Sequence, residues 1–416
     1  MTKSKLKVMT IVGTRPEIIR LSRTMALLDQ HLTQVIVHTG QNYDYELNEI
    51  FWTELELRKP DYFLNVDVSS LGATIGDIFR KTEEVLIKEK PDALLVLGDT
   101  NSCLSAYMAK RMHIPVFHME AGNRCFDENV PEETNRKIID HIADFNLVYT
   151  EHARRHLLSE GLPHRRIYLT GSPMKEVLDY YKPKIDNSNI LEKLSLTRPA
   201  ASGVRRAGKT TINEKRETLN YFLVSVHREE NVDNPENLTK ILIILNRLAE
   251  KYDLPIIVST HPRTRKRLET PHTANLTPHA LIQFLKPFGL IDYVHLEQHA
   301  LCTISDSGTI SEESAILSFP AISLRQSMER PEAQDAGTII LTGFDPEIVL
   351  SSIETTIAEF KLRRTPFDRR NFSEGGDTAH LPPNVQDYSI TDTSWRVLKL
   401  ILGNTKLSNI WYGINE

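Results

Sequence analysis

Two apolar segments that resemble buried strands each end on a carboxylate. LLVLGD ends on Asp99, and PVFHMEAG contains Glu120. A third acid, Glu132 in VPEETNR, follows a loop that carries Arg124. Ligands of open α/β sheets bind at the carboxyl ends of strands, where an unpaired buried charge is costly. For Asp99 taken alone, the N-cap of the helix that follows it is the favoured interpretation. Together, the three acids and the arginine favour proton-transfer chemistry.

A second motif, VGTRPEIIR, predicts a strand that ends at Gly13 and a helix that begins near Pro16. Proline suits the first turn of a helix, because its missing N–H would be unpaired there. Arg15 and Arg20 then lie near a helix N-terminus, a position that favours anions. We interpret them as phosphate contacts, with a solvated helix start as the alternative. The motif is neither a Walker loop nor a GxGxxG fingerprint.

A third motif, SVHREEN, places His227 and Arg228 at the end of a predicted strand. A single histidine is more often structural than catalytic. The strand-end position and the adjacent arginine make a catalytic role about equally plausible.

The segment SDSGTISEES predicts a tight turn at Ser307 and Gly308, followed by a helix with Glu312 and Glu313 in its first turn. Backbone N–H groups in such a turn can hold a phosphate. A carboxylate one turn further on can accept hydrogen bonds from ribose hydroxyls. The alternative is an ordinary capping box. Both interpretations can hold together, because a cap leaves other N–H groups available.

The segment SLRQSMERPEA carries Arg325 and Arg330 in a loop after a predicted strand. Anion contacts and surface salt bridges explain these two arginines about equally well.

The elements around these motifs alternate between short apolar runs and helical stretches. In the first part, KVMTIVG, QVIVHTG, ALLVLGD, PVFHMEA and FNLVYTE are predicted strands. A second series contains YFLVSVHREEN, PIIVSTHPR, YVHLEQHAL, CTISDSG and PAISLR. The alternation predicts an α/β protein with parallel sheets covered by helices. We expect one domain at 1–182, a polar linker or insertion at 183–219, a second domain at 220–380 and a tail with a terminal helix at 381–416. The active site is expected in the cleft between the two domains.

Composition restricts the class of protein. The chain has 416 residues, of which 40% are hydrophobic and 25% charged, and a net charge of -5. These values predict a soluble globular protein without a general attraction for nucleic acid or membranes. Basic residues in the insertion could contact nucleic acid, although a solvated loop is favoured. The three scattered cysteines fit a reducing compartment. We predict neither a signal peptide nor a membrane span, and we expect a cytoplasmic location.

The motifs GTRPE, GDT, MEAGNR, PEETNR, TGSP, VSVHREEN, SDSGTISEE and ERPEA occur in the order found in one known family. The chain resembles the non-hydrolysing UDP-N-acetylglucosamine 2-epimerases from about residue 7 to about residue 345. The resemblance implies a GT-B fold, with two Rossmann-like domains and UDP bound by the C-terminal one. It also implies inversion at C2 of a UDP-2-acetamido sugar without NAD or metal, so no cofactor is expected.

The resemblance also implies roles for individual residues. Asp99, Glu120, Glu132 and His227 match the essential catalytic groups of the family. The expected substrate contacts are Arg15, Arg20 (where the family usually has lysine), Arg124, Arg136, Phe288 (beside the uracil), Ser307, Gly308, Glu313 and Arg330. The expected partners are a UDP-N-acetylhexosamine substrate and a second copy of the chain in a homodimer.

The expected mechanism is loss of UDP with loss of the C2 proton, followed by addition of UDP to the resulting glycal. Asn123, Cys125 and Phe126 depart from the usual family pattern and resemble the branch that acts on UDP-2-acetamido-2,6-dideoxy-L-talose. That branch makes UDP-N-acetyl-L-fucosamine for capsule or O-antigen. Gln41 is kept, but Asn42 replaces a histidine that binds activating UDP-GlcNAc in some members. The alternatives are a GT-B glycosyltransferase, a non-catalytic UDP-sugar-binding protein and a hydrolysing epimerase.

Overall fold

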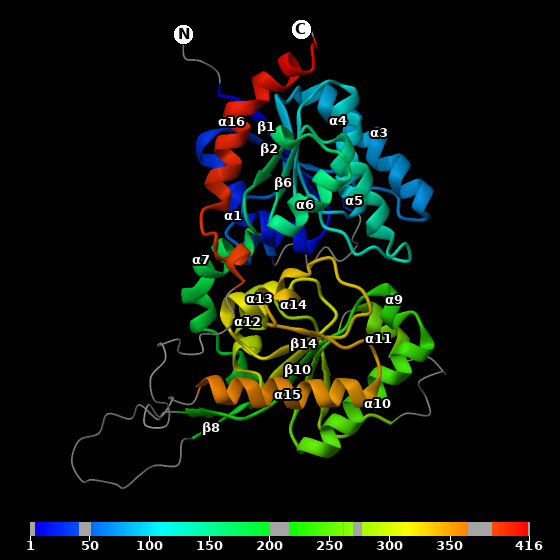
Figure 1. Cartoon of the computed structure of the whole chain (residues 1–416), viewed down its shortest axis with the longest axis vertical. Helices are drawn as coiled ribbons and strands as arrows, with labels where there is room; N and C mark the ends of the chain where they lie inside the picture. Colours follow the sequence, from blue (N-terminus) through cyan, green and yellow to red (C-terminus); the bar gives the residue numbers. More distant parts are fainter. Residues whose placement is uncertain are drawn as a thin grey trace, which may run out of the picture. The chain divides into compact units, whose positions relative to one another are not determined.

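The chain forms two compact units, each an α/β layer structure. The computed structural model describes residues 5–40, 51–199, 216–260, 262–268, 277–364 and 385–414. Unit 1 comprises Met1–Tyr180, Ser327–Glu332 and Val385–Glu416, and unit 2 comprises Tyr181–Gln326 and Ala333–Asn384. Each unit is a parallel sheet covered by helices (Figure 1). The predicted α/β class is therefore confirmed.

Unit 1 is built around a seven-stranded sheet. Its strands are β1 (Lys7–Val12), β2 (Thr33–His38), β3 (Tyr62–Phe63), β4 (Ala93–Leu97), β5 (Val116–Met119), β6 (Phe145–Val148) and β7 (Ile167–Leu169). Its helices are α1 (Arg15–His31), α3 (Leu71–Glu89), η1 (Asn101–Leu104), α4 (Ser105–Arg111), α5 (Pro131–Ile142), α6 (Glu151–Ser159), η2 (His164–Arg166), the start of α7 (Met174–Asp186), η4 (Gln386–Ser389) and α16 (Thr393–Trp411).

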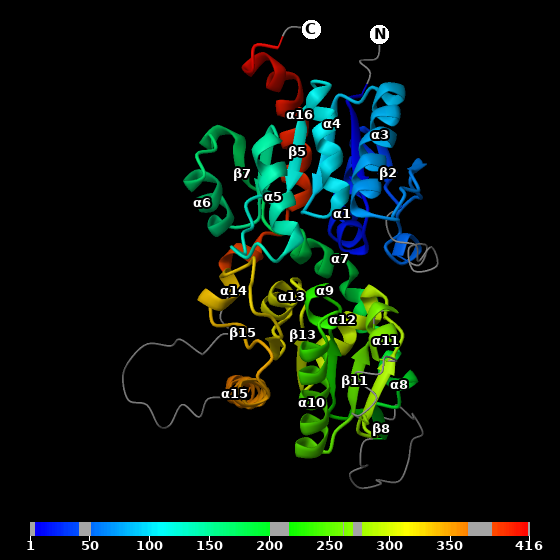
Figure 2. The same cartoon turned by 90° about the vertical axis from the view of Figure 1, so that its right-hand side faces the viewer.

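The strand order of unit 1 determines where a ligand can bind. The order is β3-β2-β1-β4-β5-β6-β7, and every recorded pair is parallel. The order reverses between β1 and β4, and such a switch point is where open α/β sheets bind ligands. The GTRPE turn follows β1 and the GDT turn follows β4. In Figure 2, α3, α4 and α5 cover one face of this sheet, while α1 and α16 lie together on the other.

Unit 2 is built around a six-stranded parallel sheet and a separate pair of short strands. Its strands are β8 (Thr197–Pro199), β9 (Arg216–Thr218), β10 (Phe222–Ser225), β11 (Ile256–Ser259), β12 (Ile282–Leu285), β13 (Cys302–Ser305), β14 (Ala321–Ser323) and β15 (Ile340–Leu341). Its helices are α8 (Ile190–Lys193), α9 (Glu229–Val232), α10 (Pro235–Tyr252), α11 (Pro262–Leu268), α12 (Leu290–His299), α13 (Ile310–Leu317), α14 (Glu332–Asp335, which begins in unit 1) and α15 (Pro346–Arg364).

Side chains of β10 alternate between two hydrophobic cores, as strand geometry requires. Phe222 and Val224 pack in the core that includes residues of α10 and α15. Tyr221, just before the strand, and Leu223 pack in the opposite core, with residues of α8 and α12. The sheet order is β12-β11-β10-β13-β14-β15, so this switch point lies between β10 and β13. These strands carry the SVHREEN and SDSG motifs at their ends.

Three segments differ from, or add to, the elements predicted from the sequence. YVHLEQHAL does not contain a strand: most of it is α12, and the neighbouring strand is β12, in the preceding LIQFL run. A short apolar run does not by itself distinguish a buried helix from a strand. The predicted 183–219 linker contains α8 and the antiparallel β8–β9 pair among its described residues. The predicted terminal helix is α16, which packs on α1 in unit 1. Gln41 and Asn42, for which the resemblance implied a comparison with the activator site, and residues 200–215 of the insertion lie outside the described residues.

Candidate active site

Glu120 lies directly after β5 in a left-handed backbone conformation, with φ of 66°. A residue other than glycine adopts this region at a cost of about 1–2 kcal/mol, and such strain is concentrated at functional sites. Gly122 completes the turn with φ of 83°, and a Cβ there would lie 2.4 Å from the carbonyl oxygen of Ala153. The turn that carries Glu120 is therefore tightly restricted.

Two arginines hold the carboxylate of Glu120. Arg20 Nη1 donates to Glu120 Oε2 at 2.6 Å, and Arg330 Nη2 donates to Glu120 Oε1. All three side chains are buried. Burial alone would raise the pKa of Glu120, but the charges of Arg20 and Arg330 outweigh it and lower the pKa. Glu120 is therefore an ionised carboxylate, and Arg330 is a buried partner rather than part of a surface salt bridge.

Asp99 follows β4 and forms an ion pair with α5. Arg136 Nε donates to Asp99 Oδ2 at 2.6 Å, and Arg136 Nη1 donates to Glu133 Oε2 at 2.9 Å. The N-cap of the following η1 is Thr100, so the alternative role of Asp99 as that N-cap is wrong. Glu132 lies beside Glu133 in the first turn of α5 and is partly exposed. The predicted carboxylates thus come from three elements at one edge of the unit 1 sheet.

Arg124 occupies a different environment from the one predicted. Its side chain has no exposed surface. Nε donates to Glu160 Oε1 and Nη1 to Asp140 Oδ2, each at 2.7 Å. Asp140 also accepts from the backbone N–H of Gly122. Arg124 thus links Asp140 and Glu160 beneath the Glu120 turn, and its substrate contact stays a prediction.

Arg15 is the first residue of α1, after the N-cap Thr14, and Pro16 lies in the same first turn, as the motif predicts. The Arg15 guanidinium carbon lies 5.4 Å from the ring centroid of Phe51. This cation–π contact fixes a half-exposed side chain near the start of a 17-residue helix. Its position remains compatible with the predicted phosphate contact.

In unit 2, the backbone after β10 is attached to Asp306, which follows β13. The N–H groups of His227 and Arg228 donate to the Asp306 carboxylate at 3.0 to 3.1 Å, and Asn231 Nδ2 donates at 2.9 Å. His227 Nδ1 lies 3.1 Å from Oδ1 of the same carboxylate. The Asp306 side chain has no exposed surface. Asp306 therefore fixes both the His227 ring and the turn that carries it.

The electrostatics of Asp306 follow from these contacts. Burial alone would raise the pKa of its carboxyl group. The His227 side chain, together with hydrogen bonds from His227, Asn231 and the Arg228 backbone, instead lowers the pKa from 3.8 to about 2. Asp306 is thus ionised at neutral pH. Asp306 is the aspartate of the SDSG motif, from which the sequence analysis predicts a role only for Ser307 and Gly308.

The Ser307–Gly308 turn leads into α13. Ser307 Oγ accepts from the backbone N–H of Thr309 at 3.3 Å, and the two hydroxyls lie 2.8 Å apart. The N-cap is Thr309, whose side chain makes no capping hydrogen bond. The turn is thus stabilised by Ser307, and the capping-box alternative is wrong. Glu313 lies buried in the first turn of α13, next to the Glu297 carboxyl of α12, whose pKa is raised well above its usual value by burial and by Glu313.

The two remaining predicted positions differ in burial. Phe288 is partly buried and packs against the core cluster of α8 and α12. Arg325 is buried at 3% exposure, so the surface salt bridge considered for it is wrong. Both residues lie in unit 2, at segments that follow β12 and β14.

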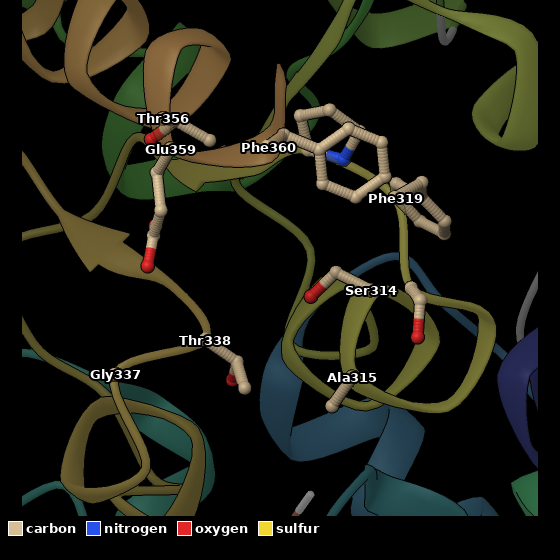
Figure 3. Close-up of a pocket in the computed structure, with 10 residues that line it drawn as sticks. Ser314, Ala315, Phe319, Gly337, Thr338, Thr356, Glu359 and Phe360 are labelled. Atoms are coloured by element: carbon tan, nitrogen blue, oxygen red, sulfur yellow. The ribbon is translucent and has the colours of Figure 1, made fainter. Parts of the chain in front are cut away.

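A small cavity in unit 2 is separate from all these residues. It lies between α13, α15 and the segments that precede β14 and β15, with Phe319 and Phe360 on one side and Ser314 and Ala315 on another (Figure 3). Its volume is about 40 Å³. Sites for small molecules usually measure about 300–1,000 Å³. No predicted site residue lines the cavity, so it is not a candidate for a nucleotide sugar.

The described ranges contain neither a candidate metal site nor a candidate membrane span. Among those residues, no group of three or more His, Cys, Asp or Glu side chains is arranged to hold a metal ion. None of the helices resolved there is both long enough and apolar enough to cross a bilayer.

Known proteins resemble the chain over most of its length. Residues 26–379 match the family model described as UDP-N-acetylglucosamine 2-epimerase. A protein of that name from Methanococcus maripaludis is 38% identical over 367 residues, which are 88% of this chain and 95% of the relative. A UDP-2,3-diacetamido-2,3-dideoxy-D-glucuronate 2-epimerase from Pseudomonas aeruginosa is 31% identical, over 85% of this chain and 93% of the relative.

Solved structures agree with these sequence matches. A UDP-N-acetylglucosamine 2-epimerase from Rickettsia bellii is 45% identical with a TM-score of 0.82, over 98% of this chain and 100% of that one. The Methanocaldococcus jannaschii UDP-GlcNAc 2-epimerase in complex with UDP-GlcNAc and UDP is 32% identical with a TM-score of 0.80, over 95% and 99%. The chain has the GT-B fold of these isomerases and belongs to the non-hydrolysing UDP-N-acetylglucosamine 2-epimerase family.

Proposed function

We propose that this isomerase inverts C2 of a UDP-2-acetamido sugar by eliminating UDP and adding it back. The observation that carries the proposal is the group of acids and arginines at the carboxyl edge of the unit 1 sheet. Glu120 pairs with Arg20 and Arg330 after β5, and Asp99 pairs with Arg136 after β4. Buried charges must be paired, and ionisable groups whose pKa values are shifted by burial and by specific charge partners are concentrated at functional sites.

The chemistry accounts for the need for several acids. The C2 proton of such a sugar is not acidic, so simple deprotonation is unfavourable. In the proposed route, the C1–O bond to UDP breaks and C2 loses its proton, which gives a neutral 2-acetamidoglycal and UDP. The C1–O bond then re-forms while a proton is delivered to the opposite face of C2. The route needs a base and an acid near C2, and a leaving group that stays bound.

The environments of the carboxylates suggest different roles. Glu120 has a lowered pKa and two arginine partners, which makes it a weak proton acceptor. We propose that it holds Arg20 and Arg330 in place for an anionic substrate. Asp99 and Glu132 are the proposed proton-transfer groups: Asp99 has one arginine partner, Arg136, and an 18% exposed side chain, and Glu132 is partly exposed.

UDP binding is proposed for unit 2. The Ser307–Gly308 turn and His227 would bind the diphosphate, and Glu313 would accept hydrogen bonds from the ribose hydroxyls. A positioned imidazole and backbone N–H groups stabilise charge on a departing phosphate. In unit 1, Arg15 is proposed as a further phosphate contact. Phe288 is proposed to lie beside the uracil, although its packing in the unit 2 core limits its freedom to move.

The experiment is incubation of the protein with a UDP-2-acetamido sugar alone, followed by proton and phosphorus NMR. The proposal predicts a second UDP-sugar, epimeric at C2, at equilibrium with the first. A glycosyltransferase without an acceptor, or a non-catalytic binding protein, would leave the UDP-sugar unchanged. Release of free sugar together with UDP would instead indicate a hydrolysing enzyme.

The physiological substrate is proposed to be UDP-2-acetamido-2,6-dideoxy-L-talose, with UDP-N-acetyl-L-fucosamine as product. The support is the variant segment after Glu120, where Asn123 is buried and its Nδ2 lies 3.4 Å from Glu120 Oε1. Phe126, 75% exposed, adopts φ of 54° in the same loop. A pocket shaped for a 6-methyl group would bury the C6 hydroxyl of UDP-GlcNAc unpaired, at about 1–3 kcal/mol.

A direct comparison of kcat/KM tests this choice. We expect the 6-deoxy-L-talose substrate to exceed UDP-GlcNAc by about 10-fold or more if the penalty applies in the transition state. A higher value for UDP-GlcNAc would overturn the substrate proposal and leave the epimerase assignment intact.

The cellular setting also belongs to the proposal. We propose a role in capsule or O-antigen precursor synthesis, in the cytoplasm, where UDP-sugars would be available. The homodimer remains a prediction, and light scattering on the purified protein would test it. A monomeric mass over the working concentration range would contradict it.

A further inference from the structure

Glu17 is a buried carboxyl group that the proposed reaction does not use. It lies in the first turn of α1 and is 2% exposed. Its carboxylate accepts from the Gly13 N–H at 3.0 Å and from Thr14 Oγ1 at 2.7 Å. It also accepts from Ser102 Oγ at 2.5 Å and from Thr100 Oγ1 at 3.2 Å. Every one of these donors lies in unit 1.

A capping box explains only half of these contacts. In the sequence TRPE, the glutamate three residues after the N-cap Thr14 can reach back to the start of its own helix. Thr100 and Ser102, however, lie 83 and 85 residues further along the chain. They belong to the turn after β4, on the other side of the switch point. Glu17 therefore links two separate turns.

Each linked turn carries one residue of the proposed site. Arg15 follows Thr14 directly, and Asp99 directly precedes Thr100. Thr100 Oγ1 and Ser102 Oγ also lie 2.7 Å apart, so the hydroxyls form one connected network around the carboxylate. A displacement of either turn would change the distance between the guanidinium of Arg15 and the carboxylate of Asp99. A misplacement of about 1 Å in a reactive geometry can reduce a rate by about 10²-fold.

The charge on Glu17 is sensitive to pH near neutrality. Burial raises the pKa of Glu17 from 4.5 to about 7, although hydrogen bonds from Ser102 and Thr14 offset part of the rise. The thiol of Cys103 in η1 is also close, and burial together with the charges of Asp99 and Glu17 raises its pKa. The ionised form of Glu17 is the one that can accept all four donors at once.

We propose that Glu17 is a positioning residue of the epimerase, which holds the Arg15 turn and the Asp99 turn in register through its four accepted hydrogen bonds. The inference rests on the proposed function of Arg15 and Asp99 but concerns a residue that does not touch the substrate. It follows that kcat should depend on the ionisation of Glu17, and that UDP affinity should change only as far as the proposed Arg15 contact with the phosphates changes.

The test is Glu17→Gln, with exposed Glu83 of the same unit changed to Gln as the matched control. We expect Glu17→Gln to lower kcat by about 10-fold or more, and to change the Kd of uridine, which lacks the phosphates that Arg15 is proposed to contact, by less than about threefold. In the wild type, kcat should rise as pH increases through about 7, and the variant should lack this rise. Glu83→Gln should leave kcat, Kd and the pH profile unchanged. A folded Glu17→Gln protein with normal kcat and an unaltered pH profile would overturn the inference.

A milder change keeps the inference testable if Glu17→Gln does not fold. Thr100→Val removes one donor and should lower kcat, whereas Thr100→Ser, which keeps the hydroxyl, should restore most of it. Equal losses in both variants would contradict positioning by this network.

Hydrogen exchange separates this inference from the proposed function. Loss of a donor or of the carboxylate should speed exchange at the Gly13 amide, which donates directly to Glu17, whether or not the enzyme is active. If the wild type epimerises no UDP-2-acetamido sugar, the proposed function fails. If it is active and neither the rates nor Gly13 exchange respond to Glu17→Gln, the positioning role fails.

Discussion

Asp306→Asn tests how the histidine turn of unit 2 is held. The aspartate carboxylate receives the backbone N–H groups of His227 and Arg228, the Asn231 amide and the His227 ring nitrogen. An asparagine keeps the shape but replaces one oxygen with an NH₂ group that faces donors. One charge-assisted network is thereby lost, and at least one N–H group is left unpaired.

The magnitude follows from the pKa of Asp306, which falls from 3.8 to about 2 in the folded protein. Because each tenfold change in an ionisation constant corresponds to about 1.4 kcal/mol, this lowering of the pKa corresponds to roughly 2 kcal/mol of stability. Because the folded-state pKa is the lower one, this contribution is present above pH 3.8 and is lost as pH falls through about 2. At pH 7, Asp306→Asn should therefore destabilise unit 2 by roughly 2 kcal/mol.

The assay must report on unit 2. The three tryptophans, Trp52, Trp395 and Trp411, all lie in unit 1, so their fluorescence does not follow unit 2. Urea titration followed by hydrogen exchange in the β10 and β13 segments is suitable, with Asp253→Asn, an exposed site, as the control. We also expect weaker UDP binding, because the His227 turn loses its anchor. A stability loss below about 0.5 kcal/mol, with unchanged UDP affinity, would refute the account of this turn.

Three further outcomes are expected. Glu120→Gln should lower kcat by about 10²-fold, because Arg20 and Arg330 lose the carboxylate that positions them, and near-normal turnover in a kinetic assay would argue against this positioning role. Glu313→Ala should weaken UDP binding by about 1–3 kcal/mol in calorimetry, and unchanged affinity would place the ribose elsewhere. Arg124→Leu should lower stability by about 3–5 kcal/mol, because Asp140 and Glu160 lose a buried partner. A stable Arg124→Leu protein with impaired UDP binding would instead restore the ligand contact predicted from the sequence.

The sequence predicts the fold well because each half repeats a strong local pattern. Strands β1, β4 and β13 coincide with predicted apolar runs, which are followed by Gly13, by the GD turn and by the SDSG turn. The predicted motifs lie at both switch points. YVHLEQHAL was wrongly predicted as a strand, because over so short a segment its apolar residues fit the periodicity of a strand as well as that of a helix.

The site is predicted less completely, because the sequence shows which side chains are charged but not which residues they pair with. Arg330 donates a hydrogen bond to Glu120, although the two residues are 210 positions apart in the sequence. No local sequence pattern predicts this pair. Arg124 lies in the loop that carries the MEAGNR motif. Its side chain forms ion pairs with Asp140 and Glu160, which are 16 and 36 residues away in the sequence. The motifs contained Glu17 and Asp306 from the start, but only the structure gives them their hydrogen-bond donors.

Solvent isotope incorporation tests the central claim most directly. The enzyme is incubated in D₂O with UDP-GlcNAc, and in parallel with UDP-2-acetamido-2,6-dideoxy-L-talose, and the products are followed by proton NMR. Elimination and re-addition of UDP predict that the C2 proton signal of the product disappears as deuterium enters, while all sugar remains linked to UDP. Turnover to the C2 epimer with the original hydrogen retained at C2 would contradict the proposed mechanism.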